Sequence, residues 1–449
     1  MLVRFVIKNF FSFGEQKEFN MIPNSKLKTL KFHKYKRDDF ELLKMASIYG
    51  ANGSGKSNLI KGLNFLKKIV VNEKLPETLK FSHFKFQKDK SNSKQLLAIE
   101  FIQDDSAYYY ALEICKSRIM IEELYESGLG RKKDRLIFER KTDLDDKTKI
   151  IFSKEAEDNE RIQIFKSVLI EDFVKPDQPI LKLLSQRENE FLKDAKNAYK
   201  WFSVTLRIIT PATRPLALAN RIDFDPEFKK YAQDIMCAFN IGITSMNSEK
   251  RNIMELVEAT TDSHMKSIMK NVDESPNKMV SLRSERGDEL VVVKEEDDYY
   301  VKQLKLTHKG KDDISTTFSL EEESDGTIRL LDFIPAFRDI VIKNRVFVID
   351  EIERSIHPLL IKELIRKFSL DSETLGQLIF TTHESNLLDQ EMFRQDEIWF
   401  TEKDKNGVSD LYSLSDFKEH KTIDIRKGYL NGRYGSIPFL ANLHDLNWH

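Results

Sequence analysis

The residues with the clearest chemical capacity form the run Gly50-Ala51-Asn52-Gly53-Ser54-Gly55-Lys56-Ser57. Its glycines let successive backbone N–H groups curl around phosphate oxygens, and a helix that follows adds the positive end of its dipole. We expect Lys56 to reach the β- and γ-phosphates of ATP and the Ser57 hydroxyl to ligate Mg²⁺. The other expected nucleotide contacts of this phosphate-binding loop (P-loop) are Gly50, Asn52, Gly53, Ser54, Gly55 and Asn58.

A second candidate element is the apolar run Val346–Ile349, which ends in the carboxylates Asp350 and Glu351. We expect Asp350 to hold Mg²⁺, through water, at the edge of a sheet beside the phosphates. Glu351, one residue on, would point the other way and polarise the water that attacks the γ-phosphate. An apolar strand followed by an acid is common by itself, so this pattern is informative only together with the P-loop.

Two further elements depend on their position in the chain. His383 directly follows the apolar run 377–382, where an imidazole can touch the γ-phosphate and report hydrolysis, although an isolated histidine is more often structural. Ser324 lies in the polar stretch 323–327, before the apolar helical segment 328–337. Composition alone makes Ser324 a helix cap.

The pattern of apolar residues predicts the elements that position these groups. Apolar strands at 44–49, 345–349 and 377–382, with helices at 57–71 and near 357–368, predict an α/β fold with a parallel sheet. Further strands are expected at 2–8, 17–22, 96–101, 108–114, within 119–140, at 290–294 and at 299–307, with the acidic run Glu295–Asp298 at a hairpin tip. Residues 155–275 are expected to be mostly helical. Their apolar stripe of Tyr231, Ile235, Met236 and Phe239 fits core packing better than a partner surface.

These elements suggest three parts: an N-terminal lobe at 1–150, a helical insertion at 151–275 and a C-terminal lobe at 276–449. With 72 basic and 73 acidic residues among 449, no global charge attracts nucleic acid or membrane. The basic stretch from Lys26 to Arg37 is interpreted as a solvated loop, with a local basic patch as the alternative. Two cysteines and no apolar run of roughly 20 residues favour a reducing cytoplasm.

In this order, the P-loop, Ser-x-Gly, Asp-Glu and His elements resemble the ABC-type ATPases of the SMC branch. The stretches 5–13, 48–59, 323–330, 347–360, 377–388 and 429–438 are most similar to ATPases of anti-phage defence modules, namely those of the PARIS system and of AbiL-type abortive-infection operons. The resemblance implies an ABC-type P-loop ATPase fold with a helical insertion. It also implies that Ser324 and Gly326 contact the γ-phosphate bound by a second copy, although Glu-Ser-Asp-Gly replaces the usual Leu-Ser-Gly-Gly.

The same resemblance implies a Mg²⁺-contacting glutamine, for which Gln87 is the candidate and a plain surface glutamine the alternative. Related defence nucleases carry a C-terminal TOPRIM domain, for which the 66 residues after His383 are too few. The Asp143–Asp145 pair is interpreted as a solvated loop, so we expect no nuclease centre in this chain.

The function that these residues favour is an ATPase that senses phage and restrains a separately encoded toxic effector, a TOPRIM- or RloB-like nuclease. A phage-encoded trigger would release that effector. The alternative is an SMC-like repair or recombination ATPase that clamps DNA itself. An ABC transporter subunit fits poorly, because 268 residues separate Lys56 from Ser324.

Overall fold

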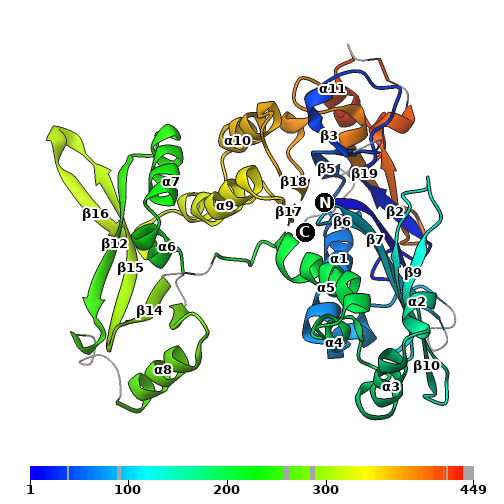
Figure 1. Ribbon diagram of the computed structural model, residues 1–449. Coiled ribbons are helices and arrows are strands. Elements are labelled where there is room, and N and C mark those ends of the chain that lie inside the picture. The colour runs from blue at the N-terminus through cyan, green and yellow to red at the C-terminus, as the bar shows by residue number, and fades with distance from the viewer. Residues whose placement is uncertain are drawn as a thin grey trace, which may run out of the picture. The chain divides into compact units, whose positions relative to one another are not determined.

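Figure 1 shows the chain as a computed structural model, which describes residues 1–37, 40–87, 93–215, 217–255, 262–283, 289–417, 419–420 and 423–437. Its contacts divide into two compact units. The first holds Met1–Pro211, Ile340–Glu353 and Lys362–His449, and the second holds Ala212–Asp339 and Arg354–Ile361. This division differs from the boundaries expected at 150/151 and 275/276, because the chain enters and leaves the second unit elsewhere.

An antiparallel sheet forms one layer of the first unit, in the order β10-β9-β8-β7-β6-β1-β2 (Figure 1). Its strands are β1 (Leu2–Lys8), β2 (Lys17–Asn20), β6 (Gln95–Gln103), β7 (Ser106–Cys115), β8 (Arg118–Glu126), β9 (Arg135–Thr142) and β10 (Thr148–Phe152). The strands predicted at the N-terminus, around residue 100 and within 119–140 are therefore confirmed. Asp104 and Asp105 form the tight turn between β6 and β7, both with positive φ.

The second layer of this unit is a sheet of order β11-β17-β18-β5-β19-β20. Its strands are β5 (Met45–Tyr49), β11 (Leu206–Ile209), β17 (Val346–Ile349), β18 (Gln377–Thr381), β19 (Ile398–Lys403) and β20 (Ser409–Ser413). Neighbours from β11 to β19 pair in parallel, and only β20 is antiparallel. The predicted parallel sheet is thus present, and its carboxyl ends collect the residues after β5, β17 and β18.

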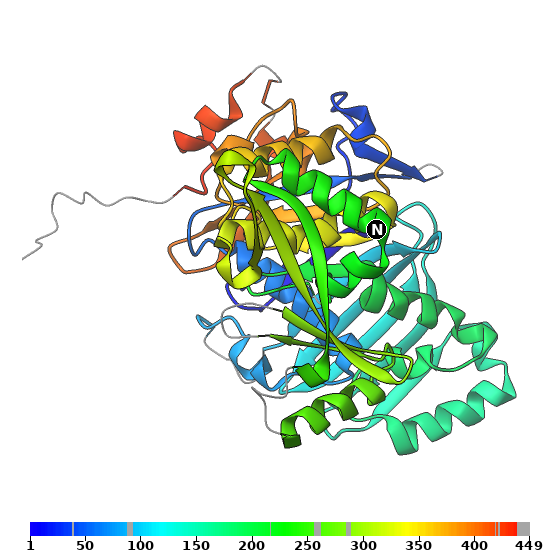
Figure 2. The same cartoon turned by 90° about the vertical axis from the view of Figure 1, so that its left-hand side faces the viewer.

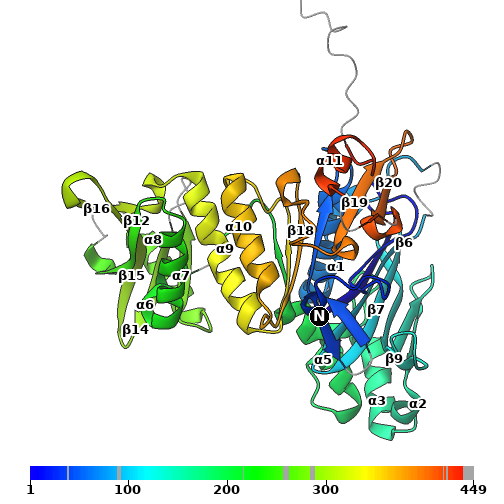
Figure 3. The same cartoon turned by 90° about the horizontal axis from the view of Figure 1, so that it is seen from above.

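Helix α1 (Lys56–Asn72) packs between the two sheets: it contacts β1 and β6 of the first sheet, and Figure 3 shows it next to β18 of the second. Its Leu59, Ile60 and Leu63 share an apolar space with side chains of β1, β2, β5, β17 and β18. The helical spacing of these residues places them on one face, which the sheets bury. The phosphate-binding loop is consequently mounted on a helix fixed from both sides.

The stretch predicted to be mostly helical begins as expected. It contains α2 (Lys154–Glu157), α3 (Glu160–Val168), α4 (Leu181–Ser185), α5 (Lys193–Lys200), α6 (Leu218–Phe224), α7 (Pro226–Ala238) and α8 (Asp262–Glu274). Trp201, directly after α5, stacks on Phe101 of β6 with ring centroids 4.3 Å apart. The prediction is wrong for β11 and for β12 (Ile243–Asn252), which pair with the distant strands β17 and β15.

The second unit is built on a sheet of order β12-β15-β14-β13, with β16 paired to β15 (Figure 2). These strands are β13 (Met279–Arg283), β14 (Glu289–Glu295), β15 (Asp298–Lys309) and β16 (Ser315–Ser319). Helices α6 and α7 pack on β12, and α8 packs on β13 and β14. In the α7 stripe, Met236 is fully buried, whereas Tyr231, Ile235 and Phe239 are half-buried. The turn between β14 and β15 holds the acidic run, as predicted.

The chain returns from the second unit through α9 (Asp325–Ile342), and α10 (Pro358–Leu370) follows β17. Buried Lys44 donates from Nζ to the carbonyls of Phe368, at 2.7 Å, Ser369, at 3.3 Å, and Asp371, and so caps the carboxyl end of α10. A short hairpin of β3 (Lys34–Arg37) and β4 (Phe40–Leu43) and a C-terminal helix α11 (Ile425–Leu430) complete the first unit.

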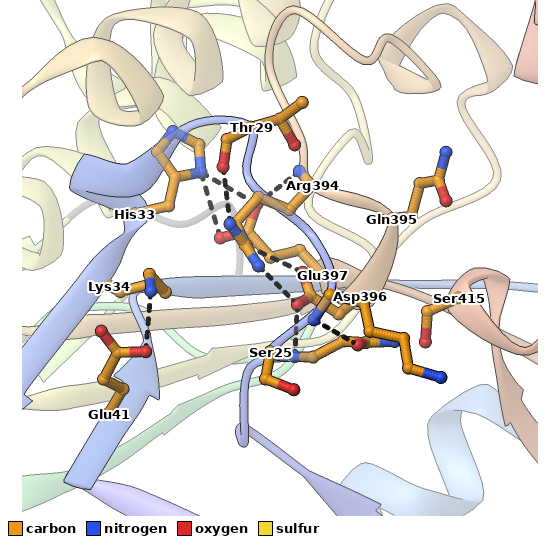
Figure 4. Close-up of polar contacts among 12 residues, drawn as sticks. Ser25, Thr29, His33, Lys34, Glu41, Arg394, Gln395, Asp396, Glu397 and Ser415 are labelled. Carbon is orange, nitrogen blue, oxygen red and sulfur yellow. Dashed lines mark hydrogen bonds and ion pairs between the residues drawn. The ribbon is translucent and has the colours of Figure 1, made fainter. Parts of the chain in front are cut away.

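Buried ionic contacts hold the loop before β3 in place, as Figure 4 shows. Arg394 forms two bonds to the Asp396 carboxylate, at 2.9 and 2.7 Å, and donates to the Thr29 carbonyl at 2.6 Å. His33 Nδ1 lies 2.9 Å from Glu397 Oε2, with both side chains fully buried. A loop with almost no secondary structure is therefore fastened to the segment before β19. Among the described residues, none of the helices is long and apolar enough to span a membrane.

Candidate functional site

The predicted P-loop lies between the end of β5 and the first turn of α1. Gly55 has φ of +124°, and a Cβ at this position would lie 2.4 Å from Ser409 Oγ, so only glycine fits. The Ser409 hydroxyl donates to the Ser54 carbonyl at 2.6 Å and lies 2.7 Å from the Ser12 hydroxyl. β20 and the turn after β1 therefore fix the loop from outside.

The polar side chains predicted to contact the nucleotide divide into two groups. Ser54 Oγ lies 2.6 Å from Thr401 Oγ1 of β19, and Asn58 Nδ2 donates to Ser12 Oγ at 2.8 Å. Both side chains thus support the loop. Ser54 and Asn58 would therefore contact a phosphate through their main-chain groups. Asn52 and Gly53 are exposed at the tip of the loop. The first N–H groups of α1 have no acceptor within the helix, as at any helix start, and are suited to an anion.

Lys56 is buried at the mouth of this loop with its ammonium held by uncharged groups. Nζ donates to the carbonyls of Gly50, at 2.8 Å, and Ala51, at 3.2 Å, and lies 3.4 Å from His383 Nδ1. Burial lowers the pKa of Lys56 to about 8, although the carboxylates of Glu353, Asp350 and Glu351 oppose this shift. Within the described part of the chain, Lys56 forms no ion pair, so its charge is available to a phosphate.

The predicted metal ligands Ser57 and Asp350 meet at this end of the sheet. Ser57 Oγ donates to Asp350 Oδ1 at 3.1 Å, and Thr381 Oγ1 donates to the same oxygen at 2.6 Å. The Glu351 N–H donates to Thr381 Oγ1 at 2.8 Å, and Glu351 itself has φ of +53°. A hydroxyl and a carboxylate at hydrogen-bond distance supply the hard oxygen donors that Mg²⁺ prefers, with phosphate and water as further ligands. These residues therefore fit the ion.

His383 lies beside Lys56, as expected for a residue that follows β18. Burial, and then the neighbouring Lys56 charge, lower the pKa of His383, so the imidazole is neutral near pH 7. In this arrangement a neutral Nδ1 of His383 accepts a hydrogen bond from the Lys56 ammonium. The His383 backbone N–H donates to Glu353 Oε1 at 2.7 Å. His383 and Lys56 consequently lie next to each other at the carboxyl end of the parallel sheet.

Several residues that support the site were not predicted from the sequence. Thr381 orients Asp350, Glu353 holds the main chain of His383, and Ser409 braces the P-loop. Thr381 and Glu353 lie within three residues of predicted site residues, so their proximity was the available signal. Ser409 has no such signal, because more than 350 residues separate it from the P-loop.

Gln87 is not joined to the predicted metal ligands. Its Oε1 is buried without a hydrogen-bond partner among the described residues, and no hydrogen bond links it to Ser57 or Asp350 in that part of the chain. The nearby Phe84 N–H donates to Asn9 Oδ1 at 3.2 Å, which ties this segment to β1 instead. A role for Gln87 at the metal stays a prediction.

Ser324 and Gly326 belong to the second unit, whereas the P-loop, Asp350, Glu351 and His383 belong to the first. Ser324 Oγ accepts the Thr327 N–H at 3.2 Å, so it caps α9 as composition predicted. A Cβ on Gly326 would lie 2.8 Å from the Ser355 carbonyl oxygen, which requires glycine where α9 meets the segment after Glu353. The Ser-x-Gly loop therefore has its own local support within the second unit.

Asp143 and Asp145 form a polar turn, as interpreted from the sequence. Asp143 Oδ1 accepts the backbone N–H groups of Asp145 and Lys147, both at 2.9 Å. In the described residues, no group of three or more His, Cys, Asp or Glu side chains is arranged to hold a metal ion.

The family model described as "AAA domain, putative AbiEii toxin, Type IV TA system" matches residues 45–389. Three similar solved structures are SMC heads. The head bound to the C-winged helix domain of ScpA is 12% identical, covering 93% of this chain and 99% of that one, with a TM-score of 0.43. The Thermotoga maritima head domain is 13% identical, covering 92% of this chain and 98% of that one, with a TM-score of 0.37. The Pyrococcus furiosus head, bound to the C-terminal domain of ScpA, is 14% identical, covering 96% of this chain and 99% of that one, with a TM-score of 0.40. No curated protein matches the chain.

Proposed function

Because the chain belongs to the family of AAA domains described as putative AbiEii toxins of type IV toxin–antitoxin systems, we propose that it is an ATPase of an anti-phage defence module. The fold is that of an AAA/ABC-type P-loop ATPase, as the sequence predicted. The observation that carries the proposal is the meeting of Lys56, His383 and the Ser57–Asp350 pair at the carboxyl ends of β5, β17 and β18.

Each group at this edge has a distinct part in hydrolysis. The P-loop N–H groups and the Lys56 ammonium hold the phosphates, and Ser57 and Asp350 would hold Mg²⁺. When bound, Mg²⁺ neutralises charge on the phosphate oxygens. Glu351 polarises the attacking water, and His383 contacts the γ-phosphate as its charge changes. Lys56 and His383 lie 3.4 Å apart, so one phosphate oxygen can reach both.

A second copy of the chain completes this site in our proposal. Ser324 and Gly326 would close over the γ-phosphate bound by a neighbour, as the N-cap of α9 offers a hydroxyl and free N–H groups to an anion. Their loop is supported within its own unit, by the Thr327 bond and the Ser355 contact, and so is formed independently of the P-loop. The assembly is a homodimer or a larger even-numbered oligomer.

The paired state would restrain a separately encoded toxic effector, a TOPRIM- or RloB-like nuclease, until a phage-encoded trigger arrives. ATP favours pairing because it contacts both copies, and hydrolysis removes that preference, so the equilibrium between held and released effector shifts. The family description, which names a toxin–antitoxin system, supports this role. The module would resemble PARIS or AbiL-type systems and act in the cytoplasm.

Glu351→Gln tests the proposed hydrolysis. The amide cannot polarise water as a carboxylate does, so turnover should fall roughly 10²- to 10⁴-fold while ATP affinity is retained. Steady-state ATPase rates and equilibrium binding of a fluorescent ATP analogue measure the two effects. Glu391→Ala, which removes an exposed carboxylate outside the site, is the matched control. Turnover near the wild-type rate in Glu351→Gln would reject Glu351 as the base.

Co-purification from the native operon tests the restraint of an effector. The Glu351→Gln protein, which would remain ATP-bound, should retain the co-expressed effector, whereas Lys56→Ala should lose it. Toxicity in cells should follow the released fraction. An effector that binds both variants equally, or that never co-purifies with the wild-type chain, would contradict the proposed restraint while leaving ATP hydrolysis intact.

A DNA-clamping ATPase is the second candidate, and the fastened loop before β3 favours it. Lys26, Lys28 and Lys31 of this loop and Lys36 of β3 are exposed, while Lys34 and Arg37 of β3 pair with Glu41 and Asp105. Anchoring by Arg394 and His33 holds these lysines in place, which suits contact with phosphates. DNA-stimulated turnover that falls steeply with salt, and is lost on Lys26→Glu/Lys31→Glu substitution, would favour this function over effector restraint.

A further inference from the structure

A third carboxylate follows β17, two residues beyond the proposed base. Glu353 Oε1 accepts the His383 N–H at 2.7 Å, and Oε2 is shielded from solvent without a hydrogen-bond partner among the described residues. The side chain is thus oriented by its contact with the residue after β18.

The hydrogen bond from the His383 N–H to Glu353 lies just beyond the last sheet hydrogen bond between this segment and β5. The Thr382 N–H still donates to the Ile48 carbonyl at 3.0 Å, in continuation of the pairing between β18 and β5. His383 is the next residue, and its N–H would lack an acceptor there without Glu353. His383 itself is exposed, and a carboxylate is a stronger acceptor than a neutral group, so the bond from Glu353 is what holds the main chain at this point.

The position of the His383 main chain decides where its ring lies. The ring reaches Lys56 Nζ at 3.4 Å, and the same lysine is held by the Gly50 and Ala51 carbonyls. A small rotation of the chain at residue 383 would move the ring away from the point where the γ-phosphate is expected. A misplacement of a catalytic group by about 1 Å can lower the rate of reaction roughly 100-fold.

We infer that Glu353 is a positioning residue, which fixes the backbone of His383 so that the imidazole and Lys56 face one phosphate oxygen. This inference rests on the proposed ATP hydrolysis at the P-loop. Glu353 does not touch the reacting atoms, since its hydrogen bond is to the main chain of His383. Its effect on the imidazole passes through the His383 main chain, and this dependence can be measured.

The test is a double-mutant cycle on ATP turnover. Glu353→Ala should lower kcat about 10- to 100-fold, the range for loss of a charge-assisted hydrogen bond, with the Kd for ATP within about threefold of wild type. Glu353→Gln keeps a weaker acceptor and should recover most of the loss. In a His383→Ala background, Glu353→Ala should lower kcat by less than about threefold, because the residue it positions is gone. Equal losses in both backgrounds would overturn the inference.

A second readout depends neither on turnover nor on Glu353→Ala being folded. The ring signal of His383 in an NMR spectrum, assigned by its loss in His383→Ala, should shift in Glu353→Gln and stay unchanged in the control Glu391→Ala. An unshifted ring signal in Glu353→Gln would overturn the positioning role. Failure of the wild-type chain to bind or hydrolyse ATP would instead refute the proposed function, so the two failures are distinguishable.

Discussion

Thr381→Val removes one hydroxyl that organises the metal side of the site. The Thr381 hydroxyl donates to Asp350 Oδ1 at 2.6 Å and accepts the Glu351 N–H at 2.8 Å. Valine has nearly the same shape, so the packing of β18 is preserved while both hydrogen bonds are lost. Among the described residues, Ser57 would then be the one remaining side-chain donor to Asp350, and the start of the left-handed turn at Glu351 would lose its anchor.

The expected size of the effect follows from these two bonds. Each buried group left without a partner costs roughly 1 to 3 kcal/mol, which predicts a measurable loss of stability. Loss of a residue that orients a metal ligand typically weakens metal affinity or activity about 10- to 100-fold. Because Asp350 is the ligand that Thr381 orients, we expect the Mg²⁺ concentration for half-maximal turnover to rise by that factor.

The assay is ATP turnover against Mg²⁺ concentration for the wild type, Thr381→Val and Thr381→Ser. Serine keeps the hydroxyl and should stay close to wild type, which separates hydrogen bonding from packing. Urea unfolding of each protein shows whether the native state is populated under assay conditions. A Thr381→Val protein that is folded and has an Mg²⁺ dependence within about threefold of wild type would refute the proposed organisation.

Two further predictions concern buried charge. The ring titration of His383 should have a midpoint below the usual value of 6.5, and Lys56→Met should move it upward, because the lysine charge helps to lower the pKa of His383; an unchanged midpoint would contradict the contact. Lys44→Met should cost about 1 to 3 kcal/mol in urea unfolding, since the carbonyls at the end of α10 lose their donor, whereas Lys36→Met should be silent. Burial lowers the pKa of Lys44 to about 8. In the unfolded chain this lysine keeps its proton up to about pH 10.4. Between about pH 8 and 10.4 the unfolded state therefore binds more protons, so the free energy of unfolding of the wild type should rise with pH in this range. Lys44→Met should lack this rise.

The core of the site was predictable because its signals are local. The run from Met45 to Val70 contains an apolar strand, a glycine-rich turn and an amphipathic helix in sequence, and each keeps its expected form. Asp350 and His383 were identifiable because each directly follows an apolar strand. Parallel pairing then brings these strand ends together, which is why chemistry from distant parts of the chain could be predicted at one edge.

The supports of the site could not be predicted, because they depend on contacts across the fold. β11 is a four-residue strand that follows helical segments, and its partner β17 lies far along the chain. Ser409 and Thr401 brace the P-loop from strands near the other end of the chain. The division into units is likewise set by packing that sequence periodicity does not record, so the boundaries expected at 150/151 and 275/276 differ from the structural ones.

Sharing of one active site between two copies is tested most directly by mixing two inactive variants. Ser324→Arg blocks the α9 loop that one copy offers, and Lys56→Ala removes the phosphate-binding lysine of the other. Each variant alone should be inactive, whereas a mixture can form an intact site from the undamaged halves. ATP turnover should therefore reappear on mixing and depend on the ratio of the two proteins. Turnover that stays absent at every ratio, although the two proteins associate, would contradict the shared site.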